Sequence, residues 1–235
     1  MKTKIFSAFL FMLLIVGMQG FSQSNASTQS RDLKNFSAIS LSIPADVTVK
    51  QGDFSFSINS TPEILEKIKT DVKNGELVIR FENTYNNNIH DPIKIEISMP
   101  SLVALEVNGS GEINSSSSFT GESLNLEING SGKIKLSELT YDSFAATING
   151  SGRVLELKGS GGEVKMHVNG SGEINTPGFS GKNVKCEVTG SGNISVSASE
   201  TLTAEITGSG DIRYGGSPAV KSVNISGSGT VTVMK

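Results

Sequence analysis

The segment INGSGKI, residues 128–134, is one of seven copies of a pattern in which Gly-Ser-Gly stands between an apolar residue and an Ile or Val. The seven copies follow one another at steps of 21, 20, 20, 20, 18 and 19 residues. A period this regular is typical of a repeat protein, in which each unit stacks on the next. The glycines of the seven copies are Gly109, Gly111, Gly130, Gly132, Gly150, Gly152, Gly170, Gly172, Gly190, Gly192, Gly208, Gly210, Gly227 and Gly229.

Apolar and polar residues alternate at the same register around every copy. The positions two and four residues before the first glycine are always apolar, as is the position two residues after the last glycine. A period of two predicts strands with one buried face. Each unit then holds a strand, a Gly-Ser-Gly corner, a second strand and a variable return. Stacking such units predicts an all-β fold, a parallel β-helix with about 20 residues per coil and about 4.8 Å between coils.

Two other repeated β-folds fit this pattern less well. An up-and-down barrel or a propeller also repeats its strands, but a propeller blade requires about 40 residues. Seven corners of one shared sequence fit a solenoid better.

The composition of the corner indicates a structural role. Glycine tolerates positive φ and close backbone approach, and stacked corners require both. A phosphate-binding glycine loop would be followed by a helix, whereas a strand is expected after every copy, so we reject that function. The residue before the corner is Asn in four copies and can form a side-chain ladder along the stack. The ladder candidates are Asn108, Asn129, Asn149 and Asn169.

The first 22 residues have the pattern of a signal peptide. Lys2 and Lys4 precede an apolar run over residues 5–16, and we expect cleavage after Ser22. No later stretch approaches membrane-spanning length. We expect a disordered lead-in over 23–32 and one β-helix domain over 33–235. In that domain, 33–100 form N-terminal coils with an irregular or helical insert, and 101–235 hold the seven repeats.

The insert lies near residue 61. Thr61 is a candidate N-cap, Pro62 suits the first helical position, and Ile64, Leu65 and Ile68 share one face of a helix that could extend to Val72. The segment is short, and a strand remains an alternative.

No residue pattern indicates catalysis, a cofactor or a metal. The net charge of −3 gives no reason to expect a nucleic acid partner. The single cysteine, Cys186, falls in an inward column and is interpreted as a small buried hydrophobe and not a catalytic thiol. His90 and His167 lack zinc-ligand spacing. Neighbouring acids in the outward column, such as Glu106 and Glu127, are candidates for a cation site, but we interpret them as a solvated face.

The pattern from Phe36 onward, and LVALEVNGSGEI at residues 102–113 above all, resembles the putative auto-transporter adhesin head GIN domain family. These are exported proteins of Bacteroidetes-type bacteria. The resemblance implies a right-handed β-helix in which residues 33–100 join the same solenoid. Its name suggests adhesion and implies no catalytic residues.

We therefore expect a non-enzymatic, exported β-solenoid of the bacterial cell envelope that binds a cell-surface or glycan ligand. The chain stops soon after its last repeat, so we expect no translocating barrel to follow, and a location in the periplasm or peripheral to the cell surface. The alternatives are a polysaccharide-active enzyme on the same scaffold and a structural envelope protein that associates with itself as a homo-oligomer through an open edge.

Overall fold

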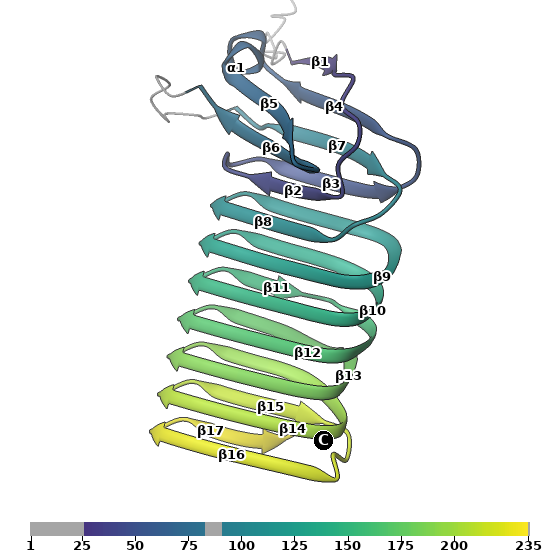
Figure 1. Ribbon diagram of the computed structural model, residues 1–235. Helices are drawn as coiled ribbons and strands as arrows, with labels where there is room; N and C mark the ends of the chain where they lie inside the picture. The colour runs from purple at the N-terminus through teal and green to yellow at the C-terminus, as the bar shows by residue number, and fades with distance from the viewer. Residues whose placement is uncertain (1–25, 83–90, 235) are drawn as a thin grey trace, which may run out of the picture.

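The computed structural model of the chain describes residues 26–82 and 91–234 and shows one continuous stack of coils (Figure 1). About 74% of it is strand and 3% helix, and the coils of about 20 residues form a solenoid of about six turns. The predicted all-β solenoid is therefore confirmed. The expected signal peptide, 1–22, and its cleavage point after Ser22 lie outside the described residues.

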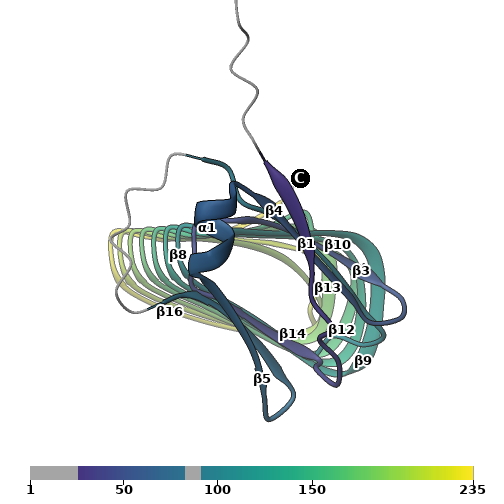
Figure 2. The ribbon, with the colours of Figure 1, turned by 90° about the horizontal axis from the view of Figure 1, so that it is seen from above.

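Each coil of the repeat region has two strand faces, joined by a tight corner at one end and a wide turn at the other (Figure 2). We call the face that ends at the first corner glycine the front sheet, and the face that begins after the second glycine the back sheet. Four of the strands run from one corner around the wide turn to the next corner, and so belong to both sheets. The strands are β8 (Ala104–Gly109), β9 (Glu112–Gly130), β10 (Lys133–Gly150), β11 (Arg153–Leu155), β12 (Lys158–Gly170), β13 (Glu173–Gly190), β14 (Asn193–Gly208), β15 (Asp211–Gly215), β16 (Val220–Gly227) and β17 (Thr230–Val233).

The coils pair in parallel, and the corner glycines stand in one column. Gly109 pairs with Gly130, and the same register carries on through every later coil to Gly227. The inward columns form one continuous apolar core, which includes the fully buried Cys186. Burial raises the pKa of the Cys186 thiol to about 12, so the thiol remains protonated at neutral pH and behaves as an apolar side chain.

The two glycines of a corner are needed for different reasons. Gly150, a first glycine, has φ +128°, and a Cβ there would lie 2.5 Å from the carbonyl oxygen of Gly130 in the preceding coil. At Gly152, a second glycine, a Cβ would lie 2.5 Å from Ile128 Cγ2. The ladder also continues through the corner, since the Ser151 N–H donates to the Gly130 carbonyl at 2.9 Å.

The N-terminal part continues the stack and then covers its end. Here β2 pairs in parallel with β6 and β8, and β3 with β7 and β9, whereas β4 and β5 pair antiparallel with their neighbours. In the described residues, no helix is long and apolar enough to cross a membrane. The elements are β1 (Ser27–Ser30), β2 (Ala38–Leu41), β3 (Asp46–Gln51), β4 (Ser55–Ser60), α1 (Pro62–Lys67), β5 (Ile68–Lys73), β6 (Glu76–Phe81) and β7 (Lys94–Met99).

Two expectations for this part are corrected. The lead-in 23–32 was expected to be disordered, but Ser27–Ser30 form β1, which pairs antiparallel with β4. The guanidinium of Arg31, just after β1, anchors it by donating to the carbonyls of Leu65 and Ile68. The helix ends at Lys67 and does not extend to Val72, because the next six residues form β5 and pair with β6.

Replacing a stacked corner glycine is expected to cost far more stability than replacing the first one. Gly109 has φ +116° but no atom near the position of an added Cβ, whereas Gly150 has both positive φ and the clash with Gly130. Gly109→Ala should therefore lose only the strain of about 1–3 kcal/mol. Gly150→Ala should lose that strain plus an overpacking cost of about 1–3 kcal/mol.

Chemical unfolding of both variants beside the parent protein measures the difference. Equal losses in the two variants would contradict the role assigned to coil-to-coil approach.

Candidate functional site

One coil departs from the repeat, at residues 156 and 157 in the back sheet. Strict alternation after Val154 would point Glu156 into the core, level with the buried Leu136 and Thr176 of the adjacent coils. A buried, unpaired carboxylate is strongly unfavourable. Glu156 instead adopts φ +62° and is exposed, and Leu157 takes the buried position. The strand is interrupted as a result, because β11 ends at Leu155 and β12 begins at Lys158.

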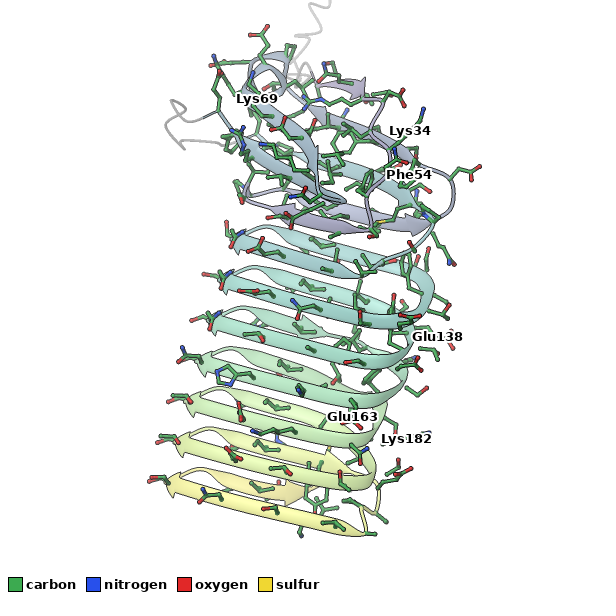
Figure 3. The ribbon with its side chains drawn as sticks, in the orientation of Figure 1. Lys34, Phe54, Lys69, Glu138, Glu163 and Lys182 are labelled. Atoms are coloured by element: carbon green, nitrogen blue, oxygen red, sulfur yellow. The ribbon has the colours of Figure 1, made fainter. Side chains whose placement is uncertain are left out.

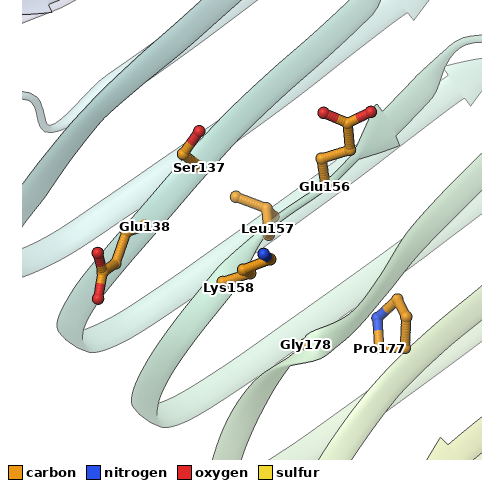
Figure 4. Close-up of a pocket in the computed structure, with 7 residues that line it drawn as sticks. All are labelled: Ser137, Glu138, Glu156, Leu157, Lys158, Pro177 and Gly178. Atoms are coloured by element: carbon orange, nitrogen blue, oxygen red, sulfur yellow. The ribbon is translucent and has the colours of Figure 1, made fainter.

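The interruption leaves a depression in the back sheet near the wide turn (Figure 4). Its volume is about 440 Å³, and a second depression of about 420 Å³ shares Ser137 and Glu156 with it. We call the two together the back groove. The first depression is lined by Ser137, Glu138, Glu156, Leu157, Lys158, Pro177 and Gly178. The second is lined by Glu112, Asn114, Ser115, Ser116, Lys135, Leu136, Ser137 and Glu156.

Pro177 marks the same interruption in the next coil. A proline has no N–H for the ladder and is tolerated in a sheet where pairing is already broken. The pairing of β13 with β14 is irregular between Asn175 and Ser180, around this proline. Gly178 beside it has no side chain, so nothing at this position fills the depression.

The rim of the back groove carries both signs of charge. Lys135 Nζ lies 3.0 Å from Glu156 Oε1, and Lys133 Nζ donates to Glu112 Oε2 at 2.8 Å. The hydrogen bond from Lys133 lowers the pKa of the Glu112 carboxyl. Lys158, in contrast, has no ion-pair partner among the described residues. Its ammonium group is therefore free to meet a ligand.

The two carboxylates of the first depression do not form a catalytic pair. Figure 4 shows the side chains of Glu138 and Glu156 on opposite sides of Leu157, with their carboxylates pointing apart. Glycoside hydrolysis requires two carboxyl groups that flank one bond from facing positions. The groove offers an apolar floor and a charged rim, which is an arrangement for binding.

The residues singled out from the sequence lie away from the back groove. The corner glycines occupy the opposite, narrow end of each coil (Figure 2). Asn129 Nδ2 donates to Asn108 Oδ1 at 3.0 Å, and Asn149 Nδ2 donates to Asn129 Oδ1 at 2.9 Å. Asn169 pairs in register with Asn149. This amide column runs beside the corners. Its hydrogen bonds connect adjacent coils, and its residues do not line the back groove.

The acids of the outward column on the front sheet are already bonded. Glu106 accepts from the Ser40 hydroxyl at 2.6 Å, and Glu187 faces both Lys185 and His167. The hydrogen bond from Lys185 is the main cause of the lowered pKa of Glu187. Within 26–82 and 91–234, no three His, Cys, Asp or Glu side chains are grouped so that they could hold a metal. His90 lies outside the described residues.

The back groove was missed at the level of sequence, although a signal for it exists. The triplet Leu155-Glu156-Leu157 places a charge at an inward register position, and Pro177 stands inside an expected strand. No adjacent coil has a charged residue at the position of Glu156 or a proline at the position of Pro177.

Fold and groove together define a β-solenoid with a surface groove. A family model described as "Putative auto-transporter adhesin, head GIN domain" matches residues 35–218, and the chain belongs to this family. No curated protein matches the sequence.

Solved structures share the fold over nearly their whole length. A putative adhesin from Bacteroides fragilis NCTC 9343 is 25% identical, with a TM-score of 0.85 over 90% of this chain and 98% of that one. A putative lipid binding protein from Parabacteroides distasonis ATCC 8503 is 26% identical, with a TM-score of 0.70 over 90% and 97%. A putative adhesin from Parabacteroides merdae ATCC 43184 is 22% identical, with a TM-score of 0.71 over 90% and 97%, and shows the fold alone.

The ion pair at the edge of the back groove should make stability depend on acid pH. The pKa of Glu112 lies below its ordinary value of 4.5 in the folded protein. Its ionised form therefore stabilises the fold above that pH, and the contribution is lost as the pH falls through the lowered pKa. Lys133→Met should return the Glu112 pKa toward 4.5 and remove this part of the pH dependence.

Carboxyl NMR titration of Glu112 in both proteins, beside Lys158→Met as the control, measures the shift. A Glu112 pKa that stays low without Lys133 would show that the cause has been misassigned.

Proposed function

We propose that this protein is an exported, non-enzymatic binding protein of the bacterial cell envelope that holds a glycan ligand in the back groove. The observation that carries the proposal is the left-handed Glu156, which opens a groove in an otherwise regular stack. Strained backbone persists where the surrounding structure enforces it, and such residues cluster at functional sites. Membership of an adhesin family supports the same class of function.

The chemistry of the groove favours a sugar. The exposed Pro177 supplies an apolar surface that suits the C–H face of a sugar ring, and Glu138, Glu156 and Lys158 stand around it. Charged groups and hydroxyls in such positions can bond to sugar hydroxyls, and bonds to charged groups are the stronger ones. The groove has no aromatic ring in its lining, so recognition rests on these polar bonds.

The location follows from the expected signal peptide. A chain whose first 22 residues direct export would act in the periplasm or peripherally at the cell surface. A ligand on a neighbouring cell or in the envelope would then be within reach of the back sheet.

Two other activities receive less support from the geometry. A polysaccharide-active enzyme would require facing carboxylates, and Glu138 and Glu156 point apart. The name of the Parabacteroides distasonis relative indicates lipid binding for that protein, whereas the back groove of this chain has a charged rim. A vesicle is therefore the competing ligand in the test below.

Removing the interruption should remove binding. The double variant Glu156→Leu/Leu157→Ser copies the Leu136-Ser137 pattern of the preceding coil and should restore a continuous strand over 153–159. It should fold, keep or raise its midpoint of thermal unfolding because the strain at Glu156 is gone, and bind no glycan that the parent protein binds on a glycan array.

A matched pair of lysines separates local from general effects. Lys158→Ala should weaken binding of the best glycan at least about tenfold, as expected for a lost charged hydrogen bond. Lys182→Ala, an exposed lysine outside the groove at the wide turn (Figure 3), should leave it unchanged. Binding to lipid vesicles without binding to any glycan, or equal loss in both lysine variants, would overturn the proposal.

A further inference from the structure

The last coil exposes the apolar core that every other coil covers. All eight residues of β16 are exposed, whereas the same columns in the earlier coils alternate between buried and accessible. Among the described residues, five large hydrophobic side chains are exposed, and four of them belong to this coil. The four are Val220 at 62%, Val223 at 43%, Ile225 at 41% and Val233 at 59%.

The backbone of this coil also has an open edge. In the ladder, outward-facing residues bond back to the preceding coil, as Asn125 N–H does to the Val103 carbonyl. Inward-facing residues, two apart along the strand, therefore bond to the coil that follows. In β16 those residues are Lys221, Val223 and Ile225, which pair in register with the buried Leu202, Ala204 and Ile206 of β14. No described strand follows β16 or β17.

Only one of the usual devices that protect an edge strand is present here, the inward-register Lys221. Natural edge strands carry charges, prolines or bulges that prevent pairing with another chain. Neither β16 nor β17 contains an acidic residue or a proline, and Lys221 is their one charged residue. Its ammonium group bonds to the Tyr214 hydroxyl at 3.1 Å and lies 5.4 Å from the centre of that ring. The single charge is thus turned back onto the preceding coil.

The other end of the stack is closed. Strands β1, β4 and β5 and helix α1 lie over it, with antiparallel pairing that ends the parallel ladder (Figures 1 and 2). A head-to-tail stack of copies would require that end to be open. Between copies of this chain, the edge of β16 and β17 can therefore meet only its own counterpart.

We propose that two copies of this chain join tail to tail through the edges of β16 and β17. The front and back strands of a coil run in opposite directions (Figure 1). A two-fold axis across the stack therefore brings the facing edges together antiparallel on both sheets. The Val223 and Ile225 columns of the two copies then close one continuous core. The contact is the same patch on both copies, so assembly stops at a dimer.

The size of the contact sets its strength. A strand of eight residues extends about 26 Å, and two sheets about 10 Å apart give a footprint of roughly 260 Å² per copy. About 520 Å² in total is less than the 1,200–2,000 Å² of a stable complex, although pairing of the edges adds main-chain hydrogen bonds. The dimer should therefore be weak and depend on protein concentration.

Sedimentation velocity of the purified protein, with its N-terminus defined by mass spectrometry, measures the mass from about 1 µM to about 1 mM. We expect monomer at the low end and a dimer that grows toward the high end. Val223→Lys should abolish the dimer because it places a cation at the centre of the contact. Val103→Lys is the matched control, since Val103 is 42% exposed but lies far from this edge, and it should dimerise like the parent.

Hydrogen exchange tests the same contact without a variant. The amides of Val223 and Ile225 should gain protection as the concentration rises, whereas that of Asn224, which already bonds to β14, should not change. Monomer at every concentration, a dimer that survives Val223→Lys, or a dimer lost equally in Val103→Lys would overturn the proposal. None of these readouts depends on a glycan.

Discussion

The approach of one corner to the next is the contact on which this structure depends. The Ser151 N–H reaches the Gly130 carbonyl at 2.9 Å, a distance that leaves no room for a Cβ at Gly150. Once glycine allows this approach in every coil, the parallel ladder runs unbroken through the corner. The register is then fixed, because a slip of one residue would turn every apolar column outward. The core, the flat sheets and the amide column follow from that register.

In a stack of coils this regular, one charged residue at an inward register position has a large effect on the local structure. In a loop, a glutamate would be solvated, but at residue 156 the adjacent coils hold the buried Leu136 and Thr176, and an unpaired carboxylate between them would be strongly unfavourable. The chain resolves the conflict with a left-handed residue, and the neighbouring coil carries Pro177 where its ladder is already interrupted. The back groove is thus a local defect held in place by rigid coils on both sides. Rigid elements position a binding site more exactly than loops do.

The repeat region was predictable from sequence because its information is redundant. Seven aligned copies give the same apolar columns, so a chance alternation is excluded. The N-terminal cap offers no such redundancy: β1 consists of small polar residues, and Arg31 anchors it by bonds to residues more than 30 positions away. The back groove could not be predicted without the conformations of Glu156 and Leu157. The sequence shows that the alternation of inward and outward residues fails there, but it does not show which of the two side chains points outward.

The positions of the groove and the open edge bear on the proposed binding function. The groove lies on coils formed by residues 112–178, and the edge lies on β16 and β17, with the coil of β14 and β15 between them. Ligand binding and tail-to-tail pairing therefore use separate surfaces and do not compete. A dimer would carry two grooves held by one rigid stack. A single glycan contact in an open groove is expected to be weak, and two such contacts on a repetitive polymer raise the effective affinity only if both grooves reach it together.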